Sequence, residues 1–246
     1  MSLDGAVTTF GGFCVAKDDL RRRRLDERDA PGADLAPGHM LVDRDAGYDR
    51  AHADEHLVLR PLFSLSFFCA EFLKEERGFG ARQVFISSAS SKAALGMAFL
   101  LSMARRAGEV EIVGLTSAAN ADFVTERRAY DRVVAYRTVS SLPAEPAVFF
   151  DIAGDGSVRA AVHHHLQDAV KHSLHVGSTH RDALGAVEPG LPRPAPQLFF
   201  TPDHILKRRR ECGAEALGAC LSETWRAFLG YVKPWLLSSI RPALPA

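Results

Sequence analysis

The chain has 246 residues, 30 Lys and Arg against 30 Asp and Glu, and a hydrophobic share of 47%. This length is enough to bury a full core without disulfides or metal ions. The balanced charge gives no overall attraction to nucleic acid or to an anionic membrane, so we expect neither as a partner. No apolar run reaches the roughly 18 residues of a membrane-spanning helix, and the polar N-terminus is unlike a signal peptide. We therefore expect a cytoplasmic protein.

The four cysteines are scattered along the chain and bear on metal binding and on disulfides. No C-x-x-C pair occurs among Cys14, Cys69, Cys212 and Cys220, which argues against a zinc cluster and against a disulfide scaffold. We expect reduced, mostly buried thiols and no metal site.

Residues 1–56 differ in composition from the rest of the chain. A short apolar start at Val7–Val15 precedes a charged connection that holds Arg21–Arg24. An arginine run is able to bind phosphate or nucleic acid, but the acidic residues beside it favour a solvated charged helix. We treat 1–56 as a separate N-terminal segment and 57–246 as the main domain.

From residue 57 onward, apolar helices and strands alternate. A largely buried helix is expected over 59–76, opened near Pro61 and stopped by Gly78. Further helices are expected over 93–106, 120–128 and 158–170, and strands over 84–86, 112–115, 132–136, 147–150 and 173–176. Short strands that are apolar throughout are typical of a parallel sheet covered on both faces. The pattern predicts an α/β fold with a Rossmann-like, doubly wound parallel sheet.

The C-terminal part adds helical structure to this sheet. A Pro-rich loop over 189–196 leads to an expected strand over 198–201 and a basic segment over 207–210. Apolar residues then recur at helical spacing over 214–231, and we interpret this stripe as core. The main domain thus ends in a C-terminal helical addition.

A serine-rich turn over 87–92 lies between the first strand of the expected sheet and the next helix. The G-x-G-x-x-G and P-loop patterns are both absent here. Small residues still permit close approach of the backbone, and the hydroxyls, the lysine and the helix N-terminus suit a phosphate. A serine-rich N-cap without any ligand is the alternative. The candidate phosphate-binding residues are Ser88, Ser90, Ser91 and Lys92.

The end of the second expected strand bears on the choice of nucleotide. An acidic residue here would bind the ribose 2′-hydroxyl of NAD. The sequence instead has Thr116, Ser117 and Asn120, which are neutral donors compatible with a 2′-phosphate. If a dinucleotide binds, NADP is favoured over NAD.

These segments together resemble a known family. The resemblance is carried by Leu59-Arg60-Pro61-Leu62-Phe63 with Ser66-Phe67, the turn over 87–92, Gly114-Leu115-Thr116-Ser117 with Asn120, Tyr130-Asp131, Asp151-Ile152-Ala153-Gly154 and Val176-Gly177-Ser178-Thr179-His180. In this order they resemble the DUF2855 family over residues 45–230. That family is similar to the medium-chain dehydrogenase/reductase superfamily, in particular to its quinone oxidoreductase-like members.

The resemblance implies a Rossmann domain with NADP(H) as cofactor and hydride transfer to or from a carbonyl or activated alkene of an unidentified small molecule. By position, it places Ser88 to Lys92 at the pyrophosphate, Ser117 and Asn120 near the adenosine ribose, and Gly154, Gly177, Thr179 and His180 toward the nicotinamide. His180 is the candidate catalytic residue, because an imidazole is able to donate a proton near neutral pH. A loop histidine bonded to the backbone is the alternative.

Two departures from the family set limits on this function. Members of the superfamily usually begin with a long GroES-like barrel, whereas only residues 1–56 precede the shared region here. These residues are then a remnant of the catalytic domain or a mobile segment. The family's arginine in Thr-Ser-x-Arg-Asn is Ala119, which removes a phosphate contact. The alternative function is a non-catalytic Rossmann nucleotide-binding or scaffold protein that has lost its substrate domain. A homodimer is one option for the oligomeric state, which the sequence leaves open.

Other chemistry finds less support. His163-His164-His165 cannot share one metal ion, because adjacent helical residues point about 100° apart, and we expect a partly exposed helix face. Asp151 is expected to orient a ribose or a lysine, or to cap the next turn. No G-x-S-x-G motif supports a hydrolase.

Overall fold

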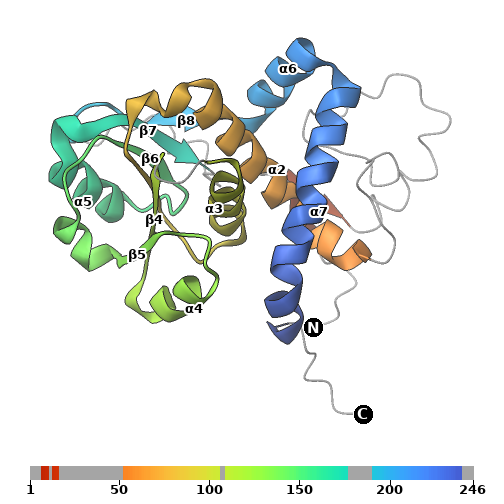
Figure 1. The fold of residues 1–246 in the computed structure, drawn as a ribbon, viewed down its shortest axis with the longest axis horizontal. Coiled ribbons are helices and arrows are strands. Elements are labelled where there is room, and N and C mark those ends of the chain that lie inside the picture. The colour runs from red at the N-terminus through yellow and green to blue at the C-terminus, as the bar shows by residue number, and fades with distance from the viewer. Residues whose placement is uncertain (1–6, 11–12, 17–51, 106–108, 177–189, 240–246) are drawn as a thin grey trace.

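The computed structural model describes residues 7–10, 13–16, 52–105, 109–176 and 190–239 (Figure 1). Near the N-terminus, strands β1 (Val7–Phe10) and β2 (Phe13–Ala16) pair antiparallel. The expected apolar start is therefore a pair of strands. The arginine run at 21–24 lies outside the described residues.

Six parallel strands form the central sheet, in the order β5-β4-β3-β6-β7-β8. They are β3 (Gln83–Ile86), β4 (Glu111–Thr116), β5 (Arg132–Ala135), β6 (Ala147–Asp151), β7 (Val170–Val176) and β8 (Gln197–Phe199). From β3 the chain moves outward through β4 to β5, and then crosses back to β6 on the other side of β3. This reversal is the topological switch point of a Rossmann-like sheet, and it confirms the predicted fold class.

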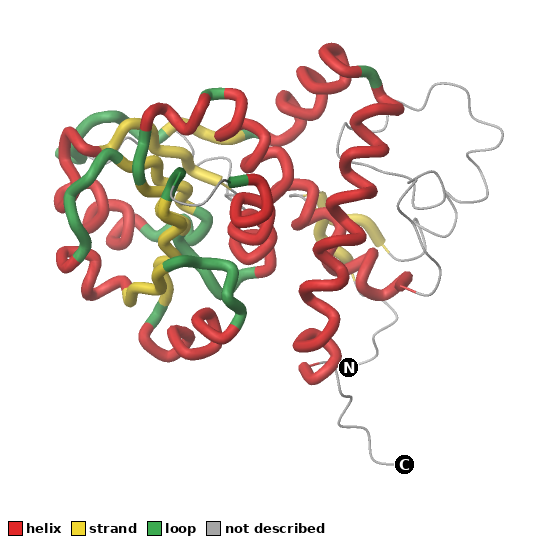
Figure 2. Tube along the Cα trace, in the orientation of Figure 1, coloured by secondary structure: helices red, strands yellow, loops and turns green. Residues whose placement is uncertain are grey.

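Helices cover both faces of the sheet. Side chains along each strand point alternately to the two faces, and the apolar ones on each face pack against these helices. Val84 and Ile86 of β3 enter the larger core, together with side chains of α2 (Ala53–Glu75), α3 (Lys92–Ala104) and α7 (Ala214–Ser239). Phe85 enters the smaller core on the other face, together with Val162 of α5 (Gly156–Leu166). Figures 1 and 2 show these layers, with α5 on one side of the sheet, α3 on the other, and α2 and α7 beyond α3.

A close approach holds α2 against α3. A Cβ built on Gly96 of α3 would lie only 2.7 Å from Ser66 Oγ of α2, so the contact requires glycine. The Ser66 hydroxyl donates to the Ala93 carbonyl over 2.7 Å. On its other side α2 meets α7, where Phe63 stacks on Phe228 at 5.1 Å between ring centroids. Helices α2, α7 and α6 (Thr201–Cys212) form a helical lobe beside the sheet, and α2 lies between α3 and α7.

The start of α2 differs from the prediction. The helix begins at Ala53 and contains Pro61 in its interior, although a start near Pro61 was expected. Leu59, before the proline, is already fully buried. Packing of this first part outweighs the backbone hydrogen bond that an interior proline removes. The helix therefore spans the predicted boundary between 1–56 and 57–246.

The predicted end of α5 is also wrong. The helix ends at Leu166 and β7 already begins at Val170, whereas a helix to 170 and a strand from 173 were expected. Val170 is buried in the smaller core and pairs with Ala147 of β6. The polar residues Lys171 and His172 hid this part of the strand from a pattern based on continuous apolar runs.

Three other predicted elements have shifted ends, and one helix, α6, was not predicted. The short helix α4 (Ala121–Glu126) follows a single turn over Ala118–Asn120. The strand β8 ends at Phe199, and α6 (Thr201–Cys212) begins directly after it with Pro202 in its first turn, where proline is tolerated. The last helix, α7, runs to Ser239, beyond the predicted end at 231.

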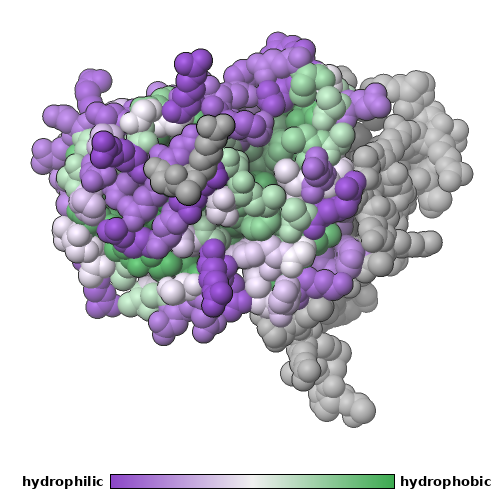
Figure 3. Space-filling model, in the orientation of Figure 1, coloured by the Kyte–Doolittle hydropathy of each residue, from purple (hydrophilic) through white to green (hydrophobic). Residues whose placement is uncertain are grey.

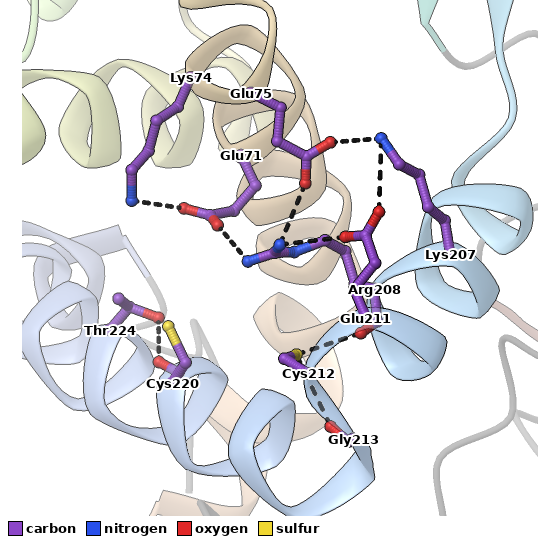
Figure 4. A network of polar contacts seen from close by, with 10 residues as sticks. All are labelled: Glu71, Lys74, Glu75, Lys207, Arg208, Glu211, Cys212, Gly213, Cys220 and Thr224. Atoms are coloured by element: carbon purple, nitrogen blue, oxygen red, sulfur yellow. Dashed lines mark hydrogen bonds and ion pairs between the residues drawn. The ribbon is translucent and has the colours of Figure 1, made fainter.

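The basic segment over 207–210 lies in α6 and joins this helix to α2 (Figure 4). Lys207 Nζ lies 2.7 Å from Glu75 Oε2, and Arg208 Nη2 lies 2.9 Å from Glu71 Oε2. Glu211 of α6 is 3.2 Å from Arg208 Nη1. The charges of Lys207 and Arg208 are therefore used inside the helical lobe.

The surface and the cysteines complete the description. Figure 3 shows mostly hydrophilic residues over the sheet lobe and more hydrophobic ones along the helical lobe. Among the described helices, none is both long enough and apolar enough to cross a membrane. Cys69 is buried, but Cys212 and Cys220 are exposed, so the expectation of buried thiols is wrong for these two.

Candidate functional site

The carboxyl ends of β3 and β6 meet at the switch point, where a Rossmann-like sheet leaves a crevice for ligands. Ser87 follows β3, Asp151 ends β6, and both are fully buried. The Ser87 hydroxyl donates to Asp151 Oδ1 over 2.9 Å and accepts from the Ala153 N–H over 2.9 Å. Asp151 Oδ1 also accepts from the Gly154 N–H over 3.0 Å. Of the roles expected for Asp151, the structure shows the cap of the following turn, and this cap ties the two strand ends together.

The serine-rich turn adopts a shape that glycine usually provides. Ser88 has a φ of 53°, in the left-handed region that costs a residue with a side chain about 1–2 kcal/mol. Its N–H donates to the Tyr136 hydroxyl over 3.0 Å, which helps to hold this conformation. Burial raises the pKa of Tyr136, so its hydroxyl stays protonated at neutral pH. Tyr136 was not predicted, because it follows β5 and meets the turn only in the folded sheet.

The first turn of α3 leaves donors available for an anion. Ser91 caps the helix, and its hydroxyl accepts from the Ala94 N–H over 3.2 Å. Within the described parts of the chain, the N–H groups of Ser90, Lys92 and Ala93 have no acceptor. Lys92 is exposed, and no described carboxylate forms an ion pair with it. Unpaired N–H groups at a helix N-terminus, beside a lysine, suit a phosphate.

A pocket of about 400 Å³ lies beside this turn. It is lined on its polar side by Ser88, Ser90, Ser91, Lys92 and Ala93, and on its apolar side by Leu62 and Leu65 of α2, Ile152 and Val176. Its volume is typical of small-molecule sites, which span roughly 300–1,000 Å³. None of the described lining residues carries a carboxylate, so none of them would repel an anion. The apolar wall from α2 was not predicted, because this helix precedes the sheet in the sequence.

The end of β4 packs directly against the turn. The Tyr130 hydroxyl donates to the Ala89 carbonyl over 3.1 Å. A Cβ on Gly114 would lie 2.9 Å from the Tyr130 ring, so this strand position needs glycine to let the ring approach. Burial raises the pKa of Tyr130, which keeps the hydroxyl protonated as a donor.

The neutral donors expected near the ribose take different places. Asn120 Nδ2 donates to Ser90 Oγ over 3.1 Å, so the structure brings this residue to the turn. Ser117 follows β4 and is half-buried, whereas Thr116 is buried within the strand. Of the three, only Asn120 contacts a residue of the pocket by a hydrogen bond between described residues.

The residues expected toward the nicotinamide are described only in part. Gly154 has a φ of 66° and lies in the turn that Asp151 caps. Gly177, Thr179 and His180 lie outside the described residues, so their roles stay predictions.

The histidine run forms a partly exposed helix face, as expected. His163 is fully buried, with Nδ1 2.9 Å from the Pro192 carbonyl oxygen and Nε2 2.9 Å from Ser173 Oγ. His164 is exposed, because neighbouring helical positions point in different directions. The described residues hold no group of three His, Cys, Asp or Glu arranged for a metal ion.

Two side chains at this edge of the sheet were missed. Arg159 of α5 donates to Asp151 Oδ2 over 2.8 Å, and His175 of β7 lies beside it. The sequence held a weak signal for His175, because this polar residue stands between the apolar Leu174 and Val176 at the end of a strand. In a covered parallel sheet, such a residue needs a partner at the carboxyl edge.

The switch point, the pocket and the first turn of α3 define a Rossmann-like protein whose sheet is compatible with nucleotide binding. The chain belongs to the DUF2855 family, since a family model described as a protein of unknown function matches residues 39–238. This match confirms the family resemblance and extends slightly beyond the expected residues 45–230. No curated protein matches the chain.

Proposed function

We propose that this protein binds NADP(H) at the carboxyl edge of its sheet, with the pyrophosphate at the turn over 88–92. The observation that carries the proposal is the set of unpaired N–H groups of Ser90, Lys92 and Ala93, which line one pocket together with the Lys92 side chain. The positive end of the helix dipole adds to their attraction for phosphate oxygens.

The remaining residues fit such a cofactor in part. Three of the turn residues offer hydroxyls, and the aliphatic wall of Leu62, Leu65 and Val176 suits a ring or a ribose face. The N–H of Ser88 already donates to Tyr136, so phosphate contacts fall to the residues after it. Because residues 116–120 hold no carboxylate, a 2′-phosphate near Asn120 meets no repulsion, which favours NADP(H) over NAD(H).

The chemistry that we propose follows from the cofactor. A bound nicotinamide supplies hydride transfer, here to or from a carbonyl or an activated alkene of a small molecule. The chain's own residues would hold the phosphates and orient the cofactor across the switch point.

Titration calorimetry with NADPH, NADP and NADH tests the proposal. We expect NADPH to bind more tightly than NADH. The Lys92→Ala variant should bind NADPH about tenfold more weakly, which corresponds to about 1.4 kcal/mol. Lys233→Ala removes an exposed lysine of α7 and is the matched control. Absence of binding to all three nucleotides would refute the proposal, and an unchanged affinity of Lys92→Ala would refute the phosphate assignment.

A test of turnover separates an oxidoreductase from a binding protein. Loss of NADPH absorbance with a panel of aldehydes, ketones and enones would show hydride transfer. If NADPH binds but no member of the panel is reduced, the non-catalytic alternative is favoured.

A further inference from the structure

A cluster of four polar side chains lies on the α5 side of the switch point. Asp151 is fully buried, while the side chains of Arg159 and His175 are 15% and 16% exposed. Arg159 Nη1 lies 2.8 Å from Asp151 Oδ2 and 3.2 Å from His175 Nδ1. Ser87 occupies the other carboxylate oxygen at 2.9 Å. The guanidinium thus bridges the carboxylate and the imidazole.

This bridge fixes the tautomer of His175. A guanidinium only donates hydrogen bonds, so Nδ1 must accept the one from Arg159. The Asp151 carboxylate is 3.6 Å from Nδ1, which is too far for a competing N–H···O hydrogen bond. With Nδ1 as the acceptor, the proton of the neutral ring lies on Nε2.

The Nε2 atom on the other side of the ring is not fully buried. No described group accepts a hydrogen bond from Nε2, and this atom is not among the buried polar atoms that lack a partner. Gly154 lies next to it, since a Cβ there would be 3.6 Å from His175 Cε1. The left-handed φ of Gly154 disfavours any side chain at this position, so glycine keeps a side chain away from this edge of the ring.

We propose that His175 Nε2–H donates a hydrogen bond to a neutral oxygen, a hydroxyl or a carbonyl, in the nicotinamide half of the bound dinucleotide. The inference rests on the proposed function. A pyrophosphate at α3 places the adenosine half toward the end of β4, where the ribose is read. The other half then crosses β6 toward β7, where His175 lies.

The same geometry makes His175 a hydrogen-bond donor toward the ligand. Because Nδ1 already accepts from Arg159, the role of the ring is to orient the ligand through Nε2–H. Arg159 is a positioning residue that acts through the ring.

Nitrogen NMR of histidine-labelled protein tests the tautomer directly. We expect one ring with an unprotonated Nδ1 and a protonated Nε2 at neutral pH, and this signal pair should disappear in His175→Gln. In Arg159→Met the ring should lose its fixed tautomer and show averaged nitrogen shifts. A protonated Nδ1 in the wild-type protein would overturn the inference, whether or not any nucleotide binds.

Binding measurements test the ligand contact. The probes are NADPH and adenosine 2′,5′-bisphosphate, which lacks the nicotinamide half. His175→Ala should weaken NADPH binding about five- to tenfold, as expected for one lost hydrogen bond, and leave the bisphosphate unchanged. His175→Gln retains an N–H donor and should recover part of the affinity. His164→Gln, an exposed histidine of α5, is the control.

The outcomes separate the two proposals. If neither probe binds the wild-type protein, the proposed function fails and the contact falls with it. If both bind and His175→Ala weakens them equally, or weakens neither, the proposed function stands and the His175 contact is refuted.

Discussion

The bridge between Ser87 and Asp151 should hold the two strand ends of the switch point together, and Ser87→Ala removes it. The substitution deletes a hydroxyl that donates to Asp151 Oδ1 and accepts from the Ala153 N–H, each over 2.9 Å. Asp151 keeps its hydrogen bonds from Gly154 and Arg159. The variant therefore weakens the junction without leaving the buried carboxylate unpaired.

The expected cost follows from these contacts. A hydrogen bond to a charged group contributes about 1.5–3 kcal/mol. Ala153 is exposed, so water replaces the Ser87 oxygen at its N–H and adds little. We expect a loss of about 2 kcal/mol, equivalent to about 4–8 °C in melting temperature for a chain of this size. Asp151→Asn should cost more, about 3–5 kcal/mol, because it breaks a buried ion pair and leaves Arg159 without its carboxylate.

Urea unfolding of the single and double variants measures these terms. Because Ser87 and Asp151 are in contact, Ser87→Ala should cost much less in the Asp151→Asn background than in the wild type. Ser140→Ala, at an exposed position, is the control and should stay within about 0.5 kcal/mol of the wild type. A loss below that size for Ser87→Ala, or strictly additive losses, would refute the reasoning.

Two further predictions concern the helical lobe and its junction with the sheet. Gly96→Ala should lower stability by about 1–3 kcal/mol in thermal unfolding, because the new Cβ would lie 2.7 Å from Ser66 Oγ. Adding Ser66→Ala should restore part of the loss, and a fully stable single variant would contradict the predicted clash. Burial lowers the pKa of His172 and His204, which stack on Phe79 and Phe199 at 4.2 and 4.1 Å. Since the folded state favours their neutral forms, stability should be full above about pH 6.5 and should fall as the pH drops below it. Urea midpoints on both sides of that pH check this, and a double His→Phe variant that stays as acid-sensitive as the wild type would oppose it.

Local patterns located most of the sheet. Strands such as Val84–Ile86 and Ala147–Phe150 are apolar throughout because both faces of a central parallel strand are buried, and this feature is visible without a structure. The same rule failed at the start of β7. Lys171 is exposed there, and His172 stacks on Phe79, so two polar residues follow Val170, and the rule reads them as a break.

The candidate site divides in the same way. The sequence placed the serine-rich turn after the first strand of the sheet and before α3, and the structure brings Ser88, Ser90, Ser91 and Lys92 to one pocket. It did not indicate that Tyr136 holds the turn. It also did not indicate the bridge from Arg159 to His175. These contacts join elements that are separated along the chain, and their residue types have no spacing that reports them.

The sequence by itself determined the class of fold, the family and the position of the serine-rich turn between β3 and α3, because burial and backbone shape leave a local trace in residue type. Only the tertiary structure decided which strand ends meet at the switch point. It also showed that α2 supplies the apolar wall of the pocket and that the buried carboxylate of Asp151 is shared by Ser87, Gly154 and Arg159. The physical reason is that hydrogen bonds and packing across a sheet depend on distance in space, which the order of residues along the chain does not specify.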